Sequence, residues 1–242
     1  MSCRHSDSNG ASALSLDLPL ARNLESVRER MAAAAARVGV PVPDLLAVTK
    51  SCDDDTFREM LALGVSAVGE NRARQCEARH GIITDGGYST AMHFIGTLQK
   101  NKVKYIIGRI ALLHSLDSLS LAEEIDRLSE KNGLKTAVLL EVNSGREPNK
   151  GGVMPEEIDR FADEIARFEN LSVQGLMTMA PNLESAEEYR PYFRETRCAF
   201  ERLSSYFDTN TPILSMGMTD SFEVAIEEGA TIVRVGSALF AH

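Results

Sequence analysis

The sequence predicts an α/β fold, a single (β/α)8 TIM-type barrel with an extra N-terminal helix. Short apolar runs rich in β-branched residues alternate with helical patterns, which is typical of parallel βαβ construction. Eight such runs occur within the 242 residues, and this number fits a closed barrel. No GxGxxG turn follows the first run, which argues against a Rossmann-type sheet. The pattern alone leaves an open sheet of eight strands as the alternative.

The chain is expected to divide into a disordered tail over residues 1–15 and a barrel domain over residues 16–242. The tail lacks the continuous apolar core of a signal peptide. From Leu20 to Val38, apolar residues recur at three- and four-residue spacing, and Gly39 and Pro41 end the pattern. This segment is the predicted helix that precedes the barrel.

The eight predicted strands are short segments rich in Val, Ile and Leu. They span residues 45–50, 65–70, 92–96, 110–116, 136–143, 171–178, 212–217 and 231–237. Helical patterns fill the intervals, for example over residues 118–133, where Ser118 can cap the start and Gly133 ends the helix. Barrels of this type carry ligand groups where strands end, so polar residues at those positions are candidate site residues.

The composition argues against several classes of function. The net charge of −9 and the pI of about 5.1 make nucleic acid an unfavourable partner, because such binding depends on clustered Lys and Arg. No segment approaches the roughly 20 apolar residues of a membrane span. The four cysteines have neither metal-ligand spacing nor a CxxC pair, so no metal site is predicted and a reducing cytoplasm is the expected location.

Lys50 closes the first predicted strand, whose other residues are apolar or small. The stem of this side chain would lie among hydrophobic groups at the barrel mouth. Partial desolvation there would favour the uncharged amine, which is a nucleophile toward aldehydes. On position alone, a lysine that reaches out to solvent from a strand end is the simpler interpretation.

Two glycine-containing turns in the last third of the chain form a candidate anion site. One follows the strand at 212–217 and precedes a helix expected to begin near Asp220, and the other follows the last strand. Loops after the seventh and eighth strands commonly bind phosphate through backbone N–H groups. The candidate residues are Ser215, Gly217, Met218, Thr219, Gly236 and Ser237. Two ordinary βα turns would show the same pattern.

Arg234 lies inside the last apolar strand, where alternation directs it to one face and its neighbours Val233 and Val235 to the other. An inward arginine would donate hydrogen bonds to a buried acceptor, such as a ring nitrogen or a carboxylate. An outward arginine beneath a surrounding helix is the alternative.

Along residues 20–240 the sequence resembles the pyridoxal phosphate homeostasis proteins, relatives of the N-terminal barrel of alanine racemase. Seven motifs in order carry the resemblance: AVTKS, GENRARQ, HFIGTLQKNK, HSLDS, EVNSGREPNKGG, GLMTMAP and SMGMTDSFEVAIEEGATIVRVGSALF. The resemblance implies that the cofactor is pyridoxal 5′-phosphate, held as a Schiff base on Lys50, with Arg234 facing the pyridine nitrogen.

The same resemblance assigns the remaining pocket residues. Thr219, Gly236 and Ser237 would hold the phosphate, and Asn71 and Met216 would line the pocket. Thr219 departs from the family, in which serine is more usual at this position. A threonine hydroxyl can still donate a hydrogen bond to phosphate.

The implied function is intracellular storage, buffering or delivery of the cofactor with little or no turnover. Arginine at the pyridine nitrogen weakens the cofactor as an electron sink. Racemisation also needs an acid/base on each face, which alanine racemase takes from a second domain, and the sequence ends at His242 soon after the last predicted strand. A monomer is expected, and cofactor-free enzymes are candidate recipients.

Two other functions stay open at this point. One is an amino-acid racemase or related enzyme that uses Lys50 on one face and His93 or another polar group on the other. The second is a scaffold that binds an unrelated phosphorylated metabolite at the two C-terminal turns, with Lys50 as an electrostatic partner.

Overall fold

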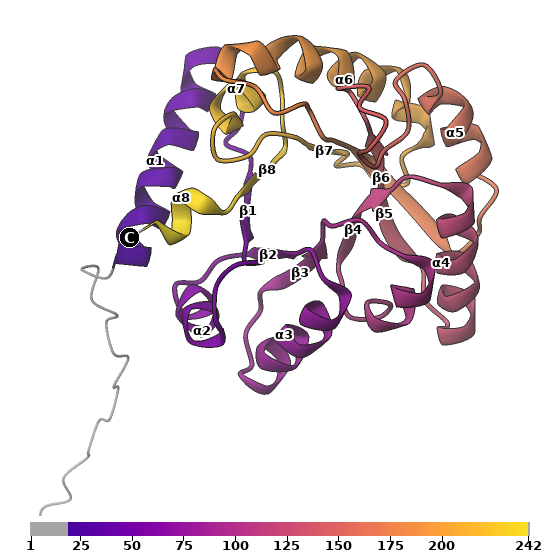
Figure 1. Ribbon diagram of the computed structural model, residues 1–242, viewed down its shortest axis with the longest axis horizontal. Coiled ribbons are helices and arrows are strands. Elements are labelled where there is room, and N and C mark those ends of the chain that lie inside the picture. Colours follow the sequence, from indigo (N-terminus) through magenta and orange to yellow (C-terminus); the bar gives the residue numbers. More distant parts are fainter. Residues whose placement is uncertain (1–18, 242) are drawn as a thin grey trace, which may run out of the picture.

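The computed structural model describes residues 19–241 and confirms the closed barrel (Figure 1). The eight strands pair in parallel in chain order, and the last pairs with the first. They are β1 (Asp44–Val48), β2 (Ala67–Glu70), β3 (Ala91–Phe94), β4 (Leu112–Leu116), β5 (Thr136–Val142), β6 (Leu171–Thr178), β7 (Ile213–Ser215) and β8 (Ile232–Val235). Each overlaps a segment predicted from the sequence. The predicted tail at residues 1–15 lies outside the described residues.

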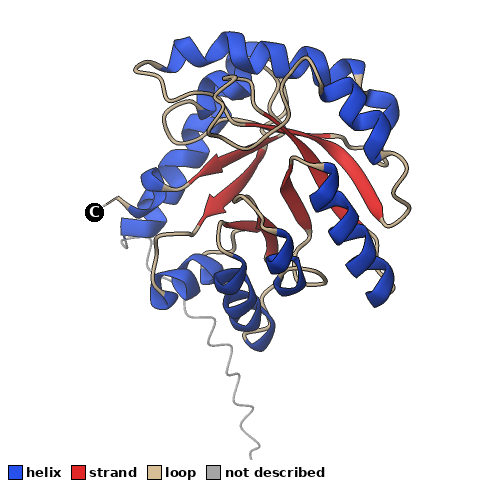
Figure 2. Ribbon diagram, turned by 45° about the vertical axis from the view of Figure 1, so that its right-hand side comes forward, coloured by secondary structure: helices blue, strands red, loops and turns tan. Residues whose placement is uncertain are grey.

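Helices surround the ring of strands on its outer side (Figures 1 and 2). They are α1 (Pro19–Val38), α2 (Asp54–Ala62), α3 (Ala73–Asp85), α4 (Leu119–Asn132), α5 (Ile158–Ile165), α6 (Arg190–Arg202), α7 (Phe222–Glu227) and α8 (Ser237–Phe240). Three 3₁₀ helices complete the set: η1 (Lys100–Tyr105), η2 (Ala186–Tyr189) and η3 (Ser204–Tyr206). The extra N-terminal helix predicted from the sequence is α1.

The ends of the helices follow the predicted signals with two differences. Gly133 ends α4 in the left-handed conformation, with φ of 63°. Ser118 stands at the N-cap position, but its hydroxyl makes no capping bond, and its carbonyl oxygen accepts from the N–H groups of Leu121 and Ala122 instead. The helix expected near Asp220 begins at Phe222.

The interior of the barrel has an apolar floor and a polar upper layer. The floor is a cluster of inward-facing side chains: Leu46, Leu112, Leu139, Met177 and Ile232. Side chains two residues further along a strand share its face, so His114, Glu141 and Arg234 lie above the floor, toward the carboxyl ends of the strands. A larger hydrophobic layer fills the space between the strands and the helices.

Helix α1 lies against α7 and α8 and so holds the last turn of the described chain (Figure 1). The Asn23 side-chain amide donates to the carbonyl oxygens of Leu239 and Ala241 at 3.0 and 2.9 Å. Arg30 pairs with Glu223 at 2.8 Å on the exposed side of this contact. Exposed pairs contribute at most about 1 kcal/mol, so the position of α1 depends mainly on its buried apolar face.

Gly175→Ala is expected to destabilise the protein by about 3 kcal/mol, because it combines backbone strain with overpacking. Gly175 has φ of 148°, and an added Cβ would lie 1.9 Å from the carbonyl oxygen of Ile213. Urea unfolding gives the free energy. Gly81→Ala is the matched control, since nothing lies within 4 Å of its Cβ, and a helical alanine at Gly81 should raise stability by about 0.5–1 kcal/mol. Equal effects of the two substitutions would contradict this account of the β6 backbone.

Candidate functional site

A cavity of about 790 Å³ opens at the carboxyl ends of the strands. Its walls come from residues at or just after the ends of β1, β2, β3, β6, β7 and β8, together with the first residues of α1, part of α2 and α8. It is lined by Pro19, Leu20, Val48, Lys50, Ser51, Cys52, Asp53, Thr56, Glu59, Asn71, Ile95, Met179, Met218, Thr219, Asp220, Arg234, Gly236, Ser237, Leu239, Phe240 and Ala241. Apolar side chains cover most of this surface, and a few polar groups converge on it, as is usual for a small-molecule site.

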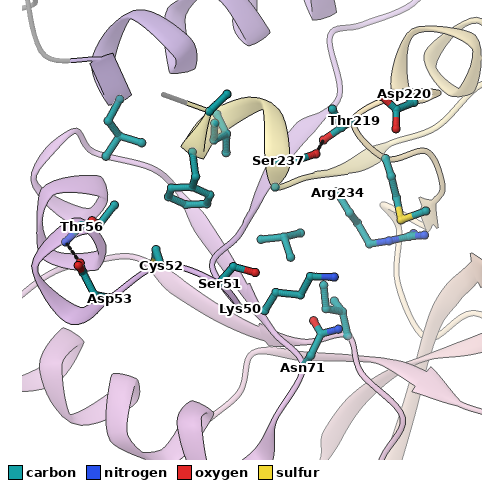
Figure 3. Close-up of a pocket in the computed structure, with 18 of the residues that line it drawn as sticks. Lys50, Ser51, Cys52, Asp53, Thr56, Asn71, Thr219, Asp220, Arg234 and Ser237 are labelled. Atoms are coloured by element: carbon teal, nitrogen blue, oxygen red, sulfur yellow. Dashed lines mark hydrogen bonds between the residues drawn. The ribbon is translucent and has the colours of Figure 1, made fainter.

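Most of the candidate residues from the sequence meet in this cavity. They are Lys50, Asn71, Met218, Thr219, Arg234, Gly236 and Ser237. Figure 3 shows Lys50, Asn71 and Arg234 directed toward one space, with Thr219 and Ser237 on its far side. The register of β1 against β8, in which Ala47 is opposite Val235, brings the two ends of the chain to the same rim.

Three candidate residues do not line the cavity. Met216, expected to line the pocket, is fully buried in the hydrophobic layer between strands and helices and is not among the residues that line this cavity. Ser215 points into the barrel below the cavity, since successive strand residues alternate between the two faces. Gly217 has φ of 87°, and its carbonyl oxygen accepts from the Arg234 N–H at 3.1 Å.

Lys50 differs from expectation in two respects. Strand β1 ends at Val48. The Thr49 N–H still pairs with the Gly69 carbonyl oxygen at 3.1 Å, and the chain turns directly after it. Lys50 therefore lies in the loop, and its side chain is exposed instead of partly desolvated. Figure 3 shows its amine pointing into the cavity, where a ligand can reach it.

A buried ion pair holds the loop that carries Lys50. Arg79 of α3 is 2% exposed, and it donates to the Glu70 carboxylate and to the Thr49 carbonyl oxygen, each at 2.7 Å. It also donates to the carbonyl oxygen of Cys52. These contacts fix the backbone on both sides of Lys50. Removing one partner of such a pair costs about 3–5 kcal/mol, since the remaining charge stays buried.

Sequence reasoning missed the role of Arg79, although one signal was present. Arg79 stands between Cys76 and Ile83 on the buried face of α3, so it is a charged residue in an apolar stripe. A charge in that position needs a buried partner. Its neighbour Cys52 is half-buried at the cavity wall, and burial raises the pKa of the Cys52 thiol against the opposing effect of Arg79. The thiol is therefore protonated at neutral pH.

Of the two orientations that the sequence left open for Arg234, the structure shows the inward one, and the residue is 4% exposed. Its guanidinium donates to the carbonyl oxygen and hydroxyl of Ser215, both at 2.8 Å, and to the carbonyl oxygen of Thr178 at 2.9 Å. The Met179 sulfur lies 3.6 Å from the same guanidinium. The acceptors are thus main-chain oxygens, a hydroxyl and a thioether, whereas a carboxylate was one of the acceptors expected. Burial lowers the pKa of Arg234 to about 10, which leaves the group charged at neutral pH.

The two C-terminal turns meet at their hydroxyl groups. Ser237 donates to the Thr219 hydroxyl oxygen at 3.0 Å, and the Ala238 N–H points to the same oxygen at 3.4 Å. Gly236 allows the close approach of β8 to β1, since an added Cβ would lie 3.3 Å from the Val48 carbonyl oxygen. The hydroxyls of Thr219 and Ser237 and the first residues of α8 therefore lie together at the rim of the barrel.

Glu141 is a second group whose role sequence reasoning missed. Its carboxyl lies in the polar layer of the barrel and is 6% exposed. Burial, reinforced by the nearby charge of Asp117, raises the pKa of Glu141 to about 7. Glu141 is inward-facing because it is two residues beyond Leu139 of the apolar floor, so strand alternation could have indicated its position.

Two kinds of feature are absent from residues 19–241. No group of three or more His, Cys, Asp or Glu side chains in this range is arranged to hold a metal ion. No helix in the same range has the length and apolar character that a membrane crossing requires.

The barrel with a lysine after β1 and paired turns after β7 and β8 defines a class of protein. The family model for the alanine racemase N-terminal domain matches residues 22–242, and the chain belongs to that family. Within it, the chain belongs to the pyridoxal phosphate homeostasis proteins. It is 42% identical over 219 residues to the homeostasis protein of Aquifex aeolicus, which covers 90% of this chain and 95% of the relative. The resemblance found in the sequence is confirmed.

Two further comparisons agree with this assignment. A pyridoxal phosphate homeostasis protein of Helicobacter pylori is 34% identical, covering 81% of this chain and 86% of that protein. The structure of PipY from Synechococcus elongatus, which contains bound pyridoxal phosphate, superposes with a TM-score of 0.76 at 30% identity. The match covers 89% of this chain and 100% of PipY.

Glu141→Gln is expected to change how stability depends on pH. The folded-state pKa of Glu141, about 7, exceeds the ordinary value of 4.5, so its stabilising contribution is full below pH 4.5 and is lost as the pH rises to 7. The amide cannot ionise, so relative to wild type the variant should gain about 2–3 kcal/mol between pH 4.5 and 8. Urea unfolding across this range measures the difference. Glu130→Gln, at an exposed position on α4, is the control, and parallel curves for wild type and Glu141→Gln would refute the assignment.

Proposed function

We propose that this chain holds pyridoxal 5′-phosphate as a Schiff base on Lys50 and stores, buffers or delivers it inside the cell. The observation that carries the proposal is the convergence of Lys50, Arg234 and the Thr219–Ser237 pair on one cavity. The naming of the relatives and the cofactor bound in PipY support it.

The residues of the cavity suit the three chemical parts of this cofactor. The exposed Lys50 amine adds to the aldehyde and water leaves, which forms the Schiff base. The hydroxyls of Thr219 and Ser237, whose oxygen atoms lie 3.0 Å apart, would hold the phosphate. The Asn71 side-chain oxygen is buried without a partner among the described residues, so it is an acceptor free for a donor on the ring.

Arg234 supports a binding role in preference to fast catalysis. A charged guanidinium only donates hydrogen bonds, so opposite a pyridine nitrogen it keeps that nitrogen unprotonated. The cofactor supplies carbanion stabilisation when its ring can accept electrons, and an unprotonated nitrogen weakens this property. We therefore propose slow or absent turnover, with cofactor-free enzymes as the recipients and a monomer as the working form.

Lys50→Ala should abolish the visible chromophore that the wild-type protein forms with pyridoxal phosphate, because no amine remains to condense with the aldehyde. Borohydride reduction followed by mass spectrometry should place the adduct on Lys50 in the wild type. Lys131→Ala, an exposed lysine on α4, is the control and should keep both signals.

An adduct on a different lysine, or none, would overturn the proposal. A colourless wild-type protein that still bound phosphorylated metabolites would favour the scaffold alternative. Exchange of the α-proton of alanine at about 1 s⁻¹ or faster would favour the racemase, since this rate lies in the ordinary range of enzymes.

Thr219→Val should weaken binding of pyridoxal phosphate by about tenfold, which corresponds to one lost hydrogen bond to a charged group. Binding of pyridoxal, which has no phosphate, should be unchanged. Absorbance titrations of the two ligands provide the comparison. Thr56→Val, on the opposite wall of the cavity (Figure 3), is the matched control. Equal weakening of both ligands would place the phosphate elsewhere.

A further inference from the structure

Four buried side chains form a continuous hydrogen-bonded chain beneath the cavity. His93 Nδ1 lies 2.9 Å from His114 Nε2, and His114 Nδ1 lies 3.0 Å from the Ser215 hydroxyl oxygen. Arg234 donates to the same hydroxyl oxygen at 2.8 Å. His114 and Ser215 are completely buried, and the strands β3, β4, β7 and β8 each supply one member. This series of hydrogen bonds therefore crosses the barrel and ends at Arg234, which lines the cavity.

The chemistry of the four groups determines which atom donates in each of these hydrogen bonds. Arginine only donates, so the Ser215 oxygen accepts from Arg234. His114 Nδ1 is the other side-chain atom bonded to that hydroxyl within residues 19–241, and the serine hydrogen therefore points to it. His114 then carries its proton on Nε2 and donates to His93 Nδ1.

The charge state of the two histidines agrees with this direction. Burial lowers the pKa of His93 to about 4. Burial, reinforced by His93 and Arg234, also lowers the pKa of His114 well below its ordinary value. Both rings are neutral at pH 7, and a neutral imidazole has one donor and one acceptor, as each position in the chain needs.

We propose that His114 is a positioning residue for the cofactor: by accepting the Ser215 hydrogen, it holds that hydroxyl as an acceptor for Arg234 and fixes the guanidinium toward the ring. This inference rests on the proposed function and deepens it. Hydrogen bonds in such a chain polarise one another, so the acceptor presented to Arg234 is stronger than an isolated hydroxyl. Loss of His114 leaves Arg234 its carbonyl partners but removes the group that orients Ser215.

Two variants of nearly equal size test this role. The side-chain oxygen of asparagine can occupy the place of His114 Nδ1 and accept from Ser215, whereas leucine cannot accept at all. His114→Leu should shift the absorbance band of the bound cofactor and weaken its binding by about tenfold. His114→Asn should stay close to wild type in both measurements. Unchanged values for His114→Leu, or equal losses in the two variants, would overturn the inference.

Two further measurements keep the test decisive if His114→Leu folds poorly. Ser215→Ala removes the hydroxyl but keeps the carbonyl, and it should reproduce the spectral shift. Ser215→Ala combined with His114→Asn should show the shift of Ser215→Ala alone, because both residues act through one chain of bonds. A normal spectrum for Ser215→Ala would refute the role of His114.

Nuclear magnetic resonance of ¹⁵N-histidine in the cofactor-free protein tests the direction of the chain without any ligand. Both His93 and His114 should carry the proton on Nε2, and a proton on His114 Nδ1 would contradict the mechanism. Borohydride trapping on wild-type Lys50 separates the two proposals. If trapping succeeds while His114→Leu behaves as wild type, this inference alone fails, and if trapping fails, the proposed function fails.

Discussion

The pairing of β8 with β1 is the constraint on which the site depends. In this pair Leu46 is opposite Arg234 and Ala47 opposite Val235, and the strands are parallel. Parallel strands end at the same rim, so the loop that begins after β1 and the turn that begins after β8 must meet there. Helix α1 reinforces this closure, since Asn23 binds the carbonyl oxygens of the last described turn.

Closure also creates a buried polar layer, in which main-chain and side-chain oxygens accept hydrogen bonds from the buried arginine. Arg234 is charged and almost without contact to water, but it donates to three oxygen atoms fixed by β6 and β7. Beneath the Lys50 loop, Arg79 donates to the Glu70 carboxylate and to the Thr49 carbonyl oxygen. An unsatisfied charge at this depth would shift its pKa or unfold the protein, so these networks hold the site rigid.

Exposure and burial divide the proposed work between two cations. Lys50 is exposed to the cavity, where it can gain or lose a ligand, and Arg234 is fixed below and cannot move without breaking main-chain contacts. A reactive amine on a loop and a rigid donor on a strand suit a protein that holds an aldehyde reversibly. Under the proposed function, this one arrangement serves both to bind the cofactor and to weaken its ring as an electron acceptor.

The sequence by itself determined the eight strands, the N-terminal helix, the family and the residues at the strand ends, because periodicity and turn residues are local properties of the chain. It also indicated Lys50, Thr219 and Arg234 as candidate residues for binding the cofactor. Only the tertiary structure decided that β1 ends before Lys50 and that Met216 faces away from the cavity. The tertiary structure alone revealed the ion pair of Arg79 with Glu70 and the hydrogen bond between His114 and Ser215. These contacts join residues of different strands and helices, and the register that brings them together exists only once the barrel has closed.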